Sequence, residues 1–126
     1  MFFETLPQQC PPADAIAAGD ALVFRAVRAN PPTIEDFHSQ AMLGTIELDG
    51  RPEEFVCRAS SCSVFTTLNG ARKLKKLPKL RDRVFVASVQ LTDDAGVIRP
   101  SAGAHMEWWI YRDFDVLSSV VEVCDA

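Results

Sequence analysis

The sequence predicts one α+β domain with a mixed, mostly antiparallel sheet and two or three short helices. Its length of 126 residues is the commonest size of a single domain. Hydrophobic residues make up 48% and charged residues 24%, which is typical of a globular protein with one core. About five to seven runs alternate in polarity, most of them in the second half. Because these strands are not regularly interleaved with helices, an antiparallel arrangement is favoured.

Residues 1–19 are predicted to form an N-terminal arm that lies over the core of this single domain, 1–126. The segment is rich in proline, alanine and glycine, and Pro7, Pro11 and Pro12 disfavour a regular element. The first residues lack the basic and apolar regions of a signal peptide, and no run approaches the roughly 20 apolar residues that span a bilayer. We therefore expect a cytoplasmic protein that is a monomer or a weak dimer.

The four cysteines are expected to be reduced thiols in that compartment, two of them buried. They are Cys10, Cys57, Cys62 and Cys124. Cys57 and Cys62 have a C-x4-C spacing, whereas structural zinc sites use a closer pair and a second pair. A buried or turn position is the simpler interpretation, so no metal is expected.

The first strand is predicted over residues 20–28, and it places Arg25 on one face between Val23 and Val27. An unpaired buried guanidinium is costly. Arg25 is therefore expected either to pair with a carboxylate or to face the anion of a ligand. A third interpretation is an edge arginine whose charged end reaches water.

A helix is predicted over residues 34–43, with Thr33 as its N-cap and Gly44 at its end. His38 lies on the apolar stripe of this helix, where a boundary residue is favoured over a ligand. The residues 45–48 and 53–57 then predict a hairpin across the turn at 49–52.

The second half predicts more strands than helices. A strand at 62–67 is followed by a helix that Thr67 caps and Pro78 ends. Residues 84–91 form the strongest strand pattern and are expected at the centre of the sheet. After a turn at 93–96, a brief strand at 97–99 and a final strand at 116–123 complete the expected elements.

The charge of the chain is unevenly distributed. Residues 72–83 contain seven basic residues and one acidic residue, a net charge of +6, which leaves −10 for the rest of a chain whose total is −4. The basic residues are Arg72, Lys73, Lys75, Lys76, Lys79, Arg81 and Arg83. The acidic remainder argues against a general nucleic-acid-binding surface. The segment is either a solvated face or a local patch that faces phosphates.

The segment from His105 to Tyr111 has the most distinctive composition, with both tryptophans and the only tyrosine. In a strand, its residues fall alternately on two faces. One face has His105, Glu107, Trp109 and Tyr111, and the other has Met106, Trp108 and Ile110. His105 and Glu107 are either part of a site or a surface pair worth about 1 kcal/mol or less.

The order of these features resembles the ADP-ribosyltransferase-like fold in its small bacterial members. The resemblance consists of an arginine in the first strand, the strand "SVFTT" before a helix with "NGARKL", and the late strand "HMEWW". It implies an NAD-binding protein that cleaves the nicotinamide–ribose bond and transfers ADP-ribose or hydrolyses NAD.

The resemblance also implies roles for individual residues. Arg25 would bind the NAD phosphates or ribose, and Ser63 and Thr66 would support the nicotinamide side. Glu107 or His105 would be the catalytic residue that holds the ribose hydroxyl or activates the acceptor. A carboxylate there would stabilise the positive charge that develops on the ribose. Trp108 or Trp109 would supply a stacking wall.

Two other functions are compatible with the same residues. The chain could be a non-catalytic protein-interaction module, such as an accessory or immunity-type protein, that binds a partner through its acidic surface or exposed aromatics. That function predicts an internally paired Arg25, with His105 and Glu107 facing water. In the second alternative, residues 72–83 bind RNA or DNA phosphates, with an affinity that falls steeply as salt rises.

Overall fold

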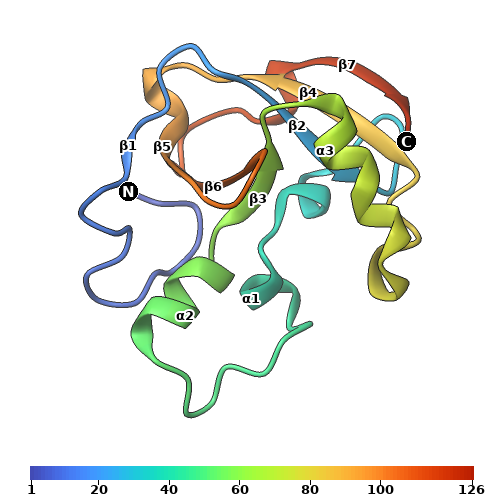
Figure 1. Cartoon of the computed structure of the whole chain (residues 1–126). Coiled ribbons are helices and arrows are strands. Elements are labelled where there is room, and N and C mark those ends of the chain that lie inside the picture. The colour runs from blue at the N-terminus through green and yellow to red at the C-terminus, as the bar shows by residue number, and fades with distance from the viewer.

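The computed structural model describes all residues, 1–126, and has one seven-stranded sheet in the order β1-β5-β6-β3-β2-β4-β7 (Figure 1). Every neighbouring pair of strands is antiparallel. The strands are β1 (Ile16–Ala17), β2 (Leu22–Val27), β3 (Cys62–Phe65), β4 (Phe85–Gln90), β5 (Gly96–Pro100), β6 (His105–Ile110) and β7 (Val120–Asp125). The predicted α+β fold class is confirmed. β4 is not at the centre of the sheet as expected, because it is the second strand from one edge, between β2 and β7.

The helices are short and lie around the sheet (Figure 1). The α-helices are α1 (Gln40–Leu43), α2 (Glu53–Ala59) and α3 (Leu68–Arg72). The 3-10 helices are η1 (Ile34–Phe37), η2 (Lys73–Lys76), η3 (Pro78–Leu80), η4 (Asp93–Ala95) and η5 (Leu117–Ser119). The longest, α2, has seven residues, so none of them could cross a bilayer.

The two faces of the sheet bury separate apolar clusters. Trp108, Val23 and Val64 belong to the larger cluster, which Phe37 of η1 completes. On the other face, Phe65 packs with Val86 and with Ala71 of α3. Trp108 and Trp109 are both buried, and only Trp108 belongs to the larger cluster. The alternation predicted for β6 therefore describes the real strand.

The backbone pairing of the sheet is sparse between β2 and β3, and we call this junction the seam. These two strands pair at a single position, Phe24 opposite Phe65. By contrast, β2 pairs with β4 over six positions, from Leu22 to Val27. Beyond Phe24 the seam is open, and the side chain of Arg25 lies in the gap.

The predicted helix over 34–43 is in fact two pieces, η1 and α1, separated by His38 and Ser39. In a continuous helix, the Asp36 and His38 carbonyls would accept hydrogen bonds from amides four residues ahead. Here Arg25 donates to both carbonyls instead. The amide of Met42 bonds to the Ser39 hydroxyl, which caps α1.

The predicted hairpin over 45–57 is wrong, because residues 53–59 form α2 and residues 45–52 contain no strand. Pro52 precedes the helix, and Glu53 and Glu54 occupy its first turn. Proline fits a helix start, and acidic residues there interact favourably with the helix dipole. These local signals outweigh the β propensity of Phe55 and Val56.

The arm, residues 1–19, was predicted to lie over the core; it runs along the edge of the sheet formed by β5 and the end of β6, and part of it forms the edge strand β1. Ile16 and Ala17 pair with β5, and the amide of Phe3 donates to the Ile110 carbonyl at 2.9 Å. A disulfide between Cys10 and Cys57 attaches the arm to α2. The expectation of four reduced thiols is therefore wrong for these two residues. They are 47 residues apart in the sequence, and nothing in the sequence shows that the fold brings them together. Cys62 and Cys124 are free.

Candidate functional site

A groove of about 890 Å³ opens beside the seam. Its walls come from α1 and the loop after it, from β2, β3 and β6, and from the segment 74–83. The polar and charged lining residues are Arg25, His38, Ser39, Gln40, Thr45, Ser61, Ser63, Lys79, Arg83 and His105. The apolar ones include Phe65, Leu43, Leu74 and Leu77. No aspartate or glutamate lines the groove, although the chain has 17 of them.

Arg25 forms the inner wall of this groove and is only 8% exposed. Its Nε donates to the Asp36 carbonyl at 2.9 Å, Nη1 to the Ser63 carbonyl at 2.7 Å and Nη2 to the His38 carbonyl at 3.2 Å. The guanidinium thus bridges η1, the segment before α1 and β3. It neither reaches bulk water nor forms a salt bridge with any carboxylate. Two of its five N–H donors are left over.

The positive charge of Arg25 acts on the free thiol nearby. Burial raises the pKa of Cys62, while the charge of Arg25 opposes this shift and Glu4 adds to it. Since a buried neutral thiol is a poor nucleophile, Cys62 is not an activated cysteine. Glu4 itself is engaged by Ser39, whose amide and hydroxyl donate to its two carboxylate oxygens at 3.0 and 2.5 Å.

His105 lines the groove at the start of β6, directly opposite Phe65 of β3. The two rings meet edge to face with 5.3 Å between their centroids. Partial burial lowers the pKa of His105; the Glu107 carboxylate raises it, and Arg58 and Arg25 lower it further. The imidazole is therefore mainly neutral at pH 7, when one ring nitrogen donates a hydrogen bond and the other accepts one.

His38, the other histidine of the chain, also lines the groove. Its ring packs against Phe3 of the arm with 5.6 Å between centroids. Its carbonyl, rather than its ring, is what holds Arg25. His38 was predicted to be a boundary residue on a helix. It is half-buried, as that prediction requires, but it lies just after the end of η1 and not on a helix.

Ser63 and Thr66, both predicted near the nicotinamide, are placed differently. Ser63 lines the groove and its carbonyl binds Arg25. Thr66 follows the end of β3, is exposed and does not line the groove. Its amide donates to the Ala104 carbonyl at 2.9 Å, which holds the loop before β6.

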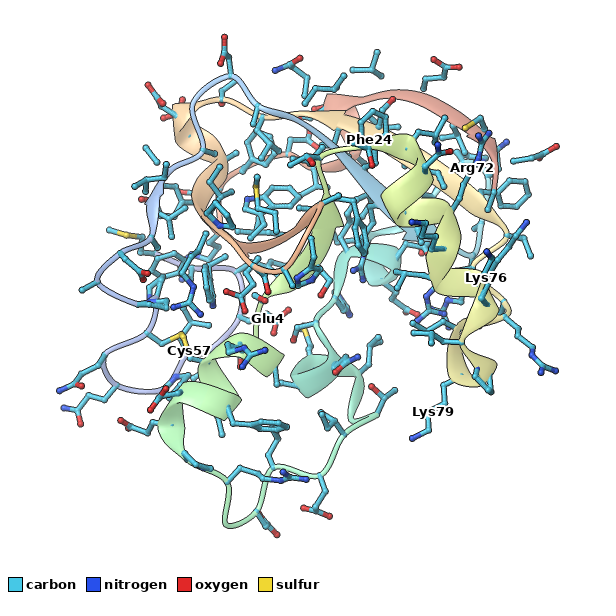
Figure 2. All side chains as sticks on the ribbon, in the orientation of Figure 1. Glu4, Phe24, Cys57, Arg72, Lys76 and Lys79 are labelled. Atoms are coloured by element: carbon cyan, nitrogen blue, oxygen red, sulfur yellow. A yellow bond between two sulfur atoms is a disulfide. The ribbon has the colours of Figure 1, made fainter.

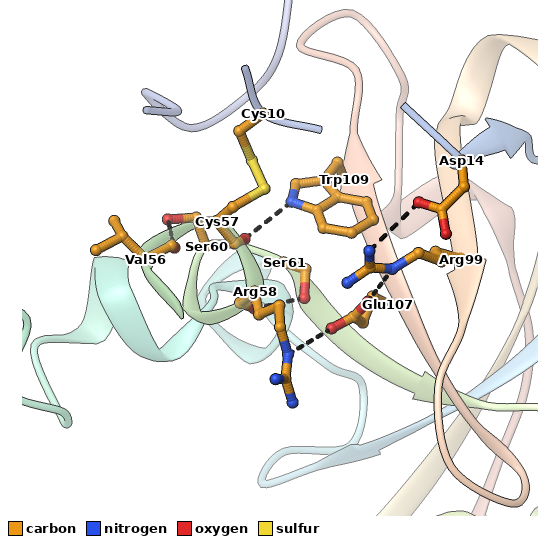
Figure 3. The surroundings of a disulfide bond; sticks show 10 residues. All are labelled: Cys10, Asp14, Val56, Cys57, Arg58, Ser60, Ser61, Arg99, Glu107 and Trp109. Atoms are coloured by element: carbon orange, nitrogen blue, oxygen red, sulfur yellow. Dashed lines mark hydrogen bonds and ion pairs between the residues drawn. A yellow bond between two sulfur atoms is a disulfide. The ribbon is translucent and has the colours of Figure 1, made fainter. Parts of the chain in front are cut away.

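Glu107 lies outside the groove and is 3% exposed (Figure 3). Arg99 of β5 donates to its Oε1 at 2.8 Å, and Arg58 of α2 donates to its Oε2 at 3.3 Å. Arg99 also reaches Asp14 of the arm at 3.3 Å. Hydrogen bonding to Glu107 raises the pKa of Arg99. Both oxygens of Glu107 are therefore occupied by protein cations.

Trp109 is also buried away from the groove, beside the disulfide (Figure 3). Its indole Nε1 donates to the Cys57 carbonyl at 3.0 Å. The ring has the guanidinium of Arg99 at 5.9 Å from its centroid. Trp109 thus connects β6 to α2 and is not placed as a stacking wall for a ligand in the groove.

The groove brings together Arg25, Ser63 and His105 from the predicted set and leaves out Thr66, Glu107 and Trp109. It adds Lys79 and Arg83, for which the only sequence signal is the basic segment 72–83. No three His, Cys, Asp or Glu side chains form a group that could hold a metal ion. Comparisons of this chain with protein-family models, with curated proteins and with solved structures find no match.

Proposed function

We propose that the groove binds a phosphate-bearing small molecule, with NAD as the first candidate because of the resemblance to the ADP-ribosyltransferase-like fold. The observation that carries the proposal is the buried charge of Arg25. This guanidinium lines the groove, has only carbonyl partners and has no carboxylate to neutralise it. A buried charge without a counter-charge is costly, and an anion in the groove would supply one.

The rest of the lining has the chemistry that such a ligand needs. Lys79 and Arg83 add two cations from the segment before β4. Arg83 is paired with Asp82 at 2.7 Å, whereas Lys79 has no acidic partner, and no acidic residue lines the groove. Phe65, Leu74 and Leu77 supply an apolar wall for a base or a nicotinamide ring. A volume of about 890 Å³ falls within the range of roughly 300–1,000 Å³ that ligand sites occupy.

The geometry favours binding over cleavage of the nicotinamide–ribose bond. Stabilising the developing positive charge on the ribose requires a carboxylate at the site. Glu107 is buried, paired with Arg58 and Arg99, and outside the groove. A transferase reaction would need this carboxylate to leave both arginines, whereas the titratable side chains that line the groove include His38, Lys79 and His105.

The proposal is independent of the compartment. Stable disulfides occur mainly in oxidising compartments. Because Cys10 and Cys57 form a disulfide, the cysteines no longer support a cytoplasmic location. The anion groove itself involves neither cysteine.

The test is an amide-resolved NMR titration with NAD. We expect saturable shifts at Arg25, Ser63 and His105 in the wild type. Lys79→Glu should abolish them, because it places a negative charge in the groove. Lys76→Glu is the matched control, since Lys76 is exposed on the same segment but does not line the groove. Arg25 is not the residue to change here, because its three hydrogen bonds also hold the fold.

An absence of shifts at millimolar NAD, or equal shifts in both variants, would contradict the proposal. The alternative would then be the non-catalytic protein-interaction module. The internal hydrogen bonding of Arg25 favours it, and so does the edge strand β7, where Val121 is 66% exposed. The buried position of Glu107 argues against the interaction module, because that alternative predicts that Glu107 faces water.

A further inference from the structure

We propose that the exposed cations of the segment before β4 extend the groove into a docking surface for single-stranded nucleic acid. We call Lys73, Lys76, Lys79 and Arg81 the basic ridge. The inference rests on the proposed anion groove and names a larger ligand for it, one whose phosphates bind along the ridge while one of them enters the groove.

The basic ridge consists of cations that the protein itself does not use. All four residues are exposed, and none of their side chains forms a hydrogen bond or a salt bridge. In contrast, Arg28, Arg58 and Arg99 each pair with a carboxylate. Two basic neighbours of the ridge are also engaged, because Arg72 donates to the Asp125 carbonyl and Lys75 to the Ala126 carbonyl.

The ridge is continuous with the groove. Lys79 belongs to both, and Leu77 and Arg83 of the same segment line the groove. Figure 2 shows Arg72, Lys76 and Lys79 following one another along one side of the molecule, far from Cys57 and the disulfide. A dinucleotide confined to the groove would leave Lys73, Lys76 and Arg81 unused, because none of them lines it. A polymer of phosphates that continues out of the groove would reach them.

A flexible single strand fits this arrangement better than a duplex does. A single strand can turn one nucleotide into a recess and keep the neighbouring phosphates on a basic surface. Inside the groove, that nucleotide would meet the buried charge of Arg25 and the rings of Phe65 and His105. The phosphates of a duplex lie on the outside of a rigid rod and cannot enter in this way.

The acidic remainder of the chain does not oppose this contact locally. The net charge is −4, but the groove has no acidic lining residue, and Asp82, the only acid of residues 72–83, is paired with Arg83 at 2.7 Å. The phosphates neutralised at the ridge release counterions, which makes the affinity fall as salt rises, and salt also screens the long-range repulsion from the acidic remainder.

The experiment measures the anisotropy of a labelled oligothymidine of roughly 12 nucleotides at several salt concentrations. We expect the logarithm of the affinity to fall linearly with the logarithm of salt, with a slope of about −0.7 for each phosphate neutralised. Lys76→Glu should weaken binding by roughly tenfold and make the slope shallower by about one phosphate. Arg51→Glu, the same charge change in the loop before α2, should leave both unchanged.

The NAD titration on the same variants separates this inference from the proposed function. NAD shifts that Lys76→Glu preserves, together with oligonucleotide binding that it weakens, would support both. NAD shifts without oligonucleotide binding would overturn only the nucleic-acid assignment. Oligonucleotide binding without NAD shifts would keep that assignment and remove the dinucleotide. Equal losses in Lys76→Glu and Arg51→Glu, or equally tight binding of an oligoglutamate peptide or phosphatidylserine vesicles, would overturn the nucleic-acid assignment.

Discussion

The Nη1 atom of Arg25 donates to the carbonyl of Ser63 at 2.7 Å, across the seam where β2 and β3 separate. A side chain here takes the place of a backbone ladder. The same guanidinium also donates to the Asp36 and His38 carbonyls, at the break between η1 and α1. One residue therefore determines both the shape of the groove wall and its charge.

Replacing Arg25 by methionine is expected to lower the free energy of unfolding by about 3–4 kcal/mol, because three carbonyls lose a charged donor. Arg25→Lys should lose most of that amount as well, since one ammonium cannot span three carbonyls in the directions of a guanidinium. Urea unfolding measures both values.

Arg28→Met is the control for Arg25. Its side chain is 40% exposed and has one ion pair with Asp36, at 3.5 Å, so a loss below about 1 kcal/mol is expected. If Arg25→Lys is as stable as the wild type, the charge and not the three hydrogen bonds is what the fold requires.

Glu107→Gln is expected to destabilise the fold by about 1–2 kcal/mol and to leave NAD shifts in the groove intact. The glutamine keeps one acceptor, and both arginines are partly exposed and can be hydrated, so the loss stays below that of a fully buried pair. Urea unfolding and the NMR titration test the two parts. Loss of ligand shifts in a folded Glu107→Gln protein would show that this carboxylate acts in the groove.

Stability is expected to fall as the pH drops below about 6.5, the ordinary pKa of histidine, because the folded pKa of His105 is lower. Between the two pKa values, the unfolded chain binds the proton more readily, so protons favour unfolding. The stability that neutral His105 contributes is fully present above the pKa of the unfolded chain. It is lost as the pH falls through the lower pKa of the folded protein. Unfolding free energies of the wild type and His105→Gln from pH 7.5 to 5 should converge at the acid end. Parallel curves would contradict this.

Reduction of the disulfide is expected to lower stability by about 3–4 kcal/mol, since Cys10 and Cys57 close a loop with a sequence separation of 47. The Trp109 emission should shift to the red as α2 loosens, because Trp109 donates to the Cys57 carbonyl. The Cys10→Ala/Cys57→Ala double variant should resemble the reduced protein and not respond to reductant. An unchanged unfolding midpoint after reduction would refute the expectation.

The strands were predictable because each has a local cause. Runs of β-formers identify β2 and β4, and the alternation of polar and aromatic residues identifies β6, to within a few residues. The final strand starts later than predicted, at Val120, because η5 occupies residues 117–119. Thr67 caps α3 as predicted, with its side chain accepting from the Gly70 amide at 3.0 Å.

The missed features depend on contacts between distant parts of the chain. The break at His38 follows from Arg25, the pairing of Cys10 follows from the position of α2, and the burial of Glu107 follows from its register opposite Arg99. Sequence periodicity identified the face of each residue but not the neighbour across it. The resemblance to the ADP-ribosyltransferase-like fold grouped Arg25, Ser63 and His105, but it could not show that Glu107 is already bound by Arg58 and Arg99.

The seam has a mechanical consequence. Backbone hydrogen bonding divides the sheet into β1-β5-β6-β3 and β2-β4-β7, joined only at Phe24 and Phe65. The first group holds the N-terminus, through Phe2 bridged to Tyr111 and the arm on β5. The second holds the C-terminus in β7. A force that pulls the two chain ends apart would therefore cross this junction, where one backbone pair, the side chain of Arg25 and the shared apolar cluster hold the two groups together in place of a ladder.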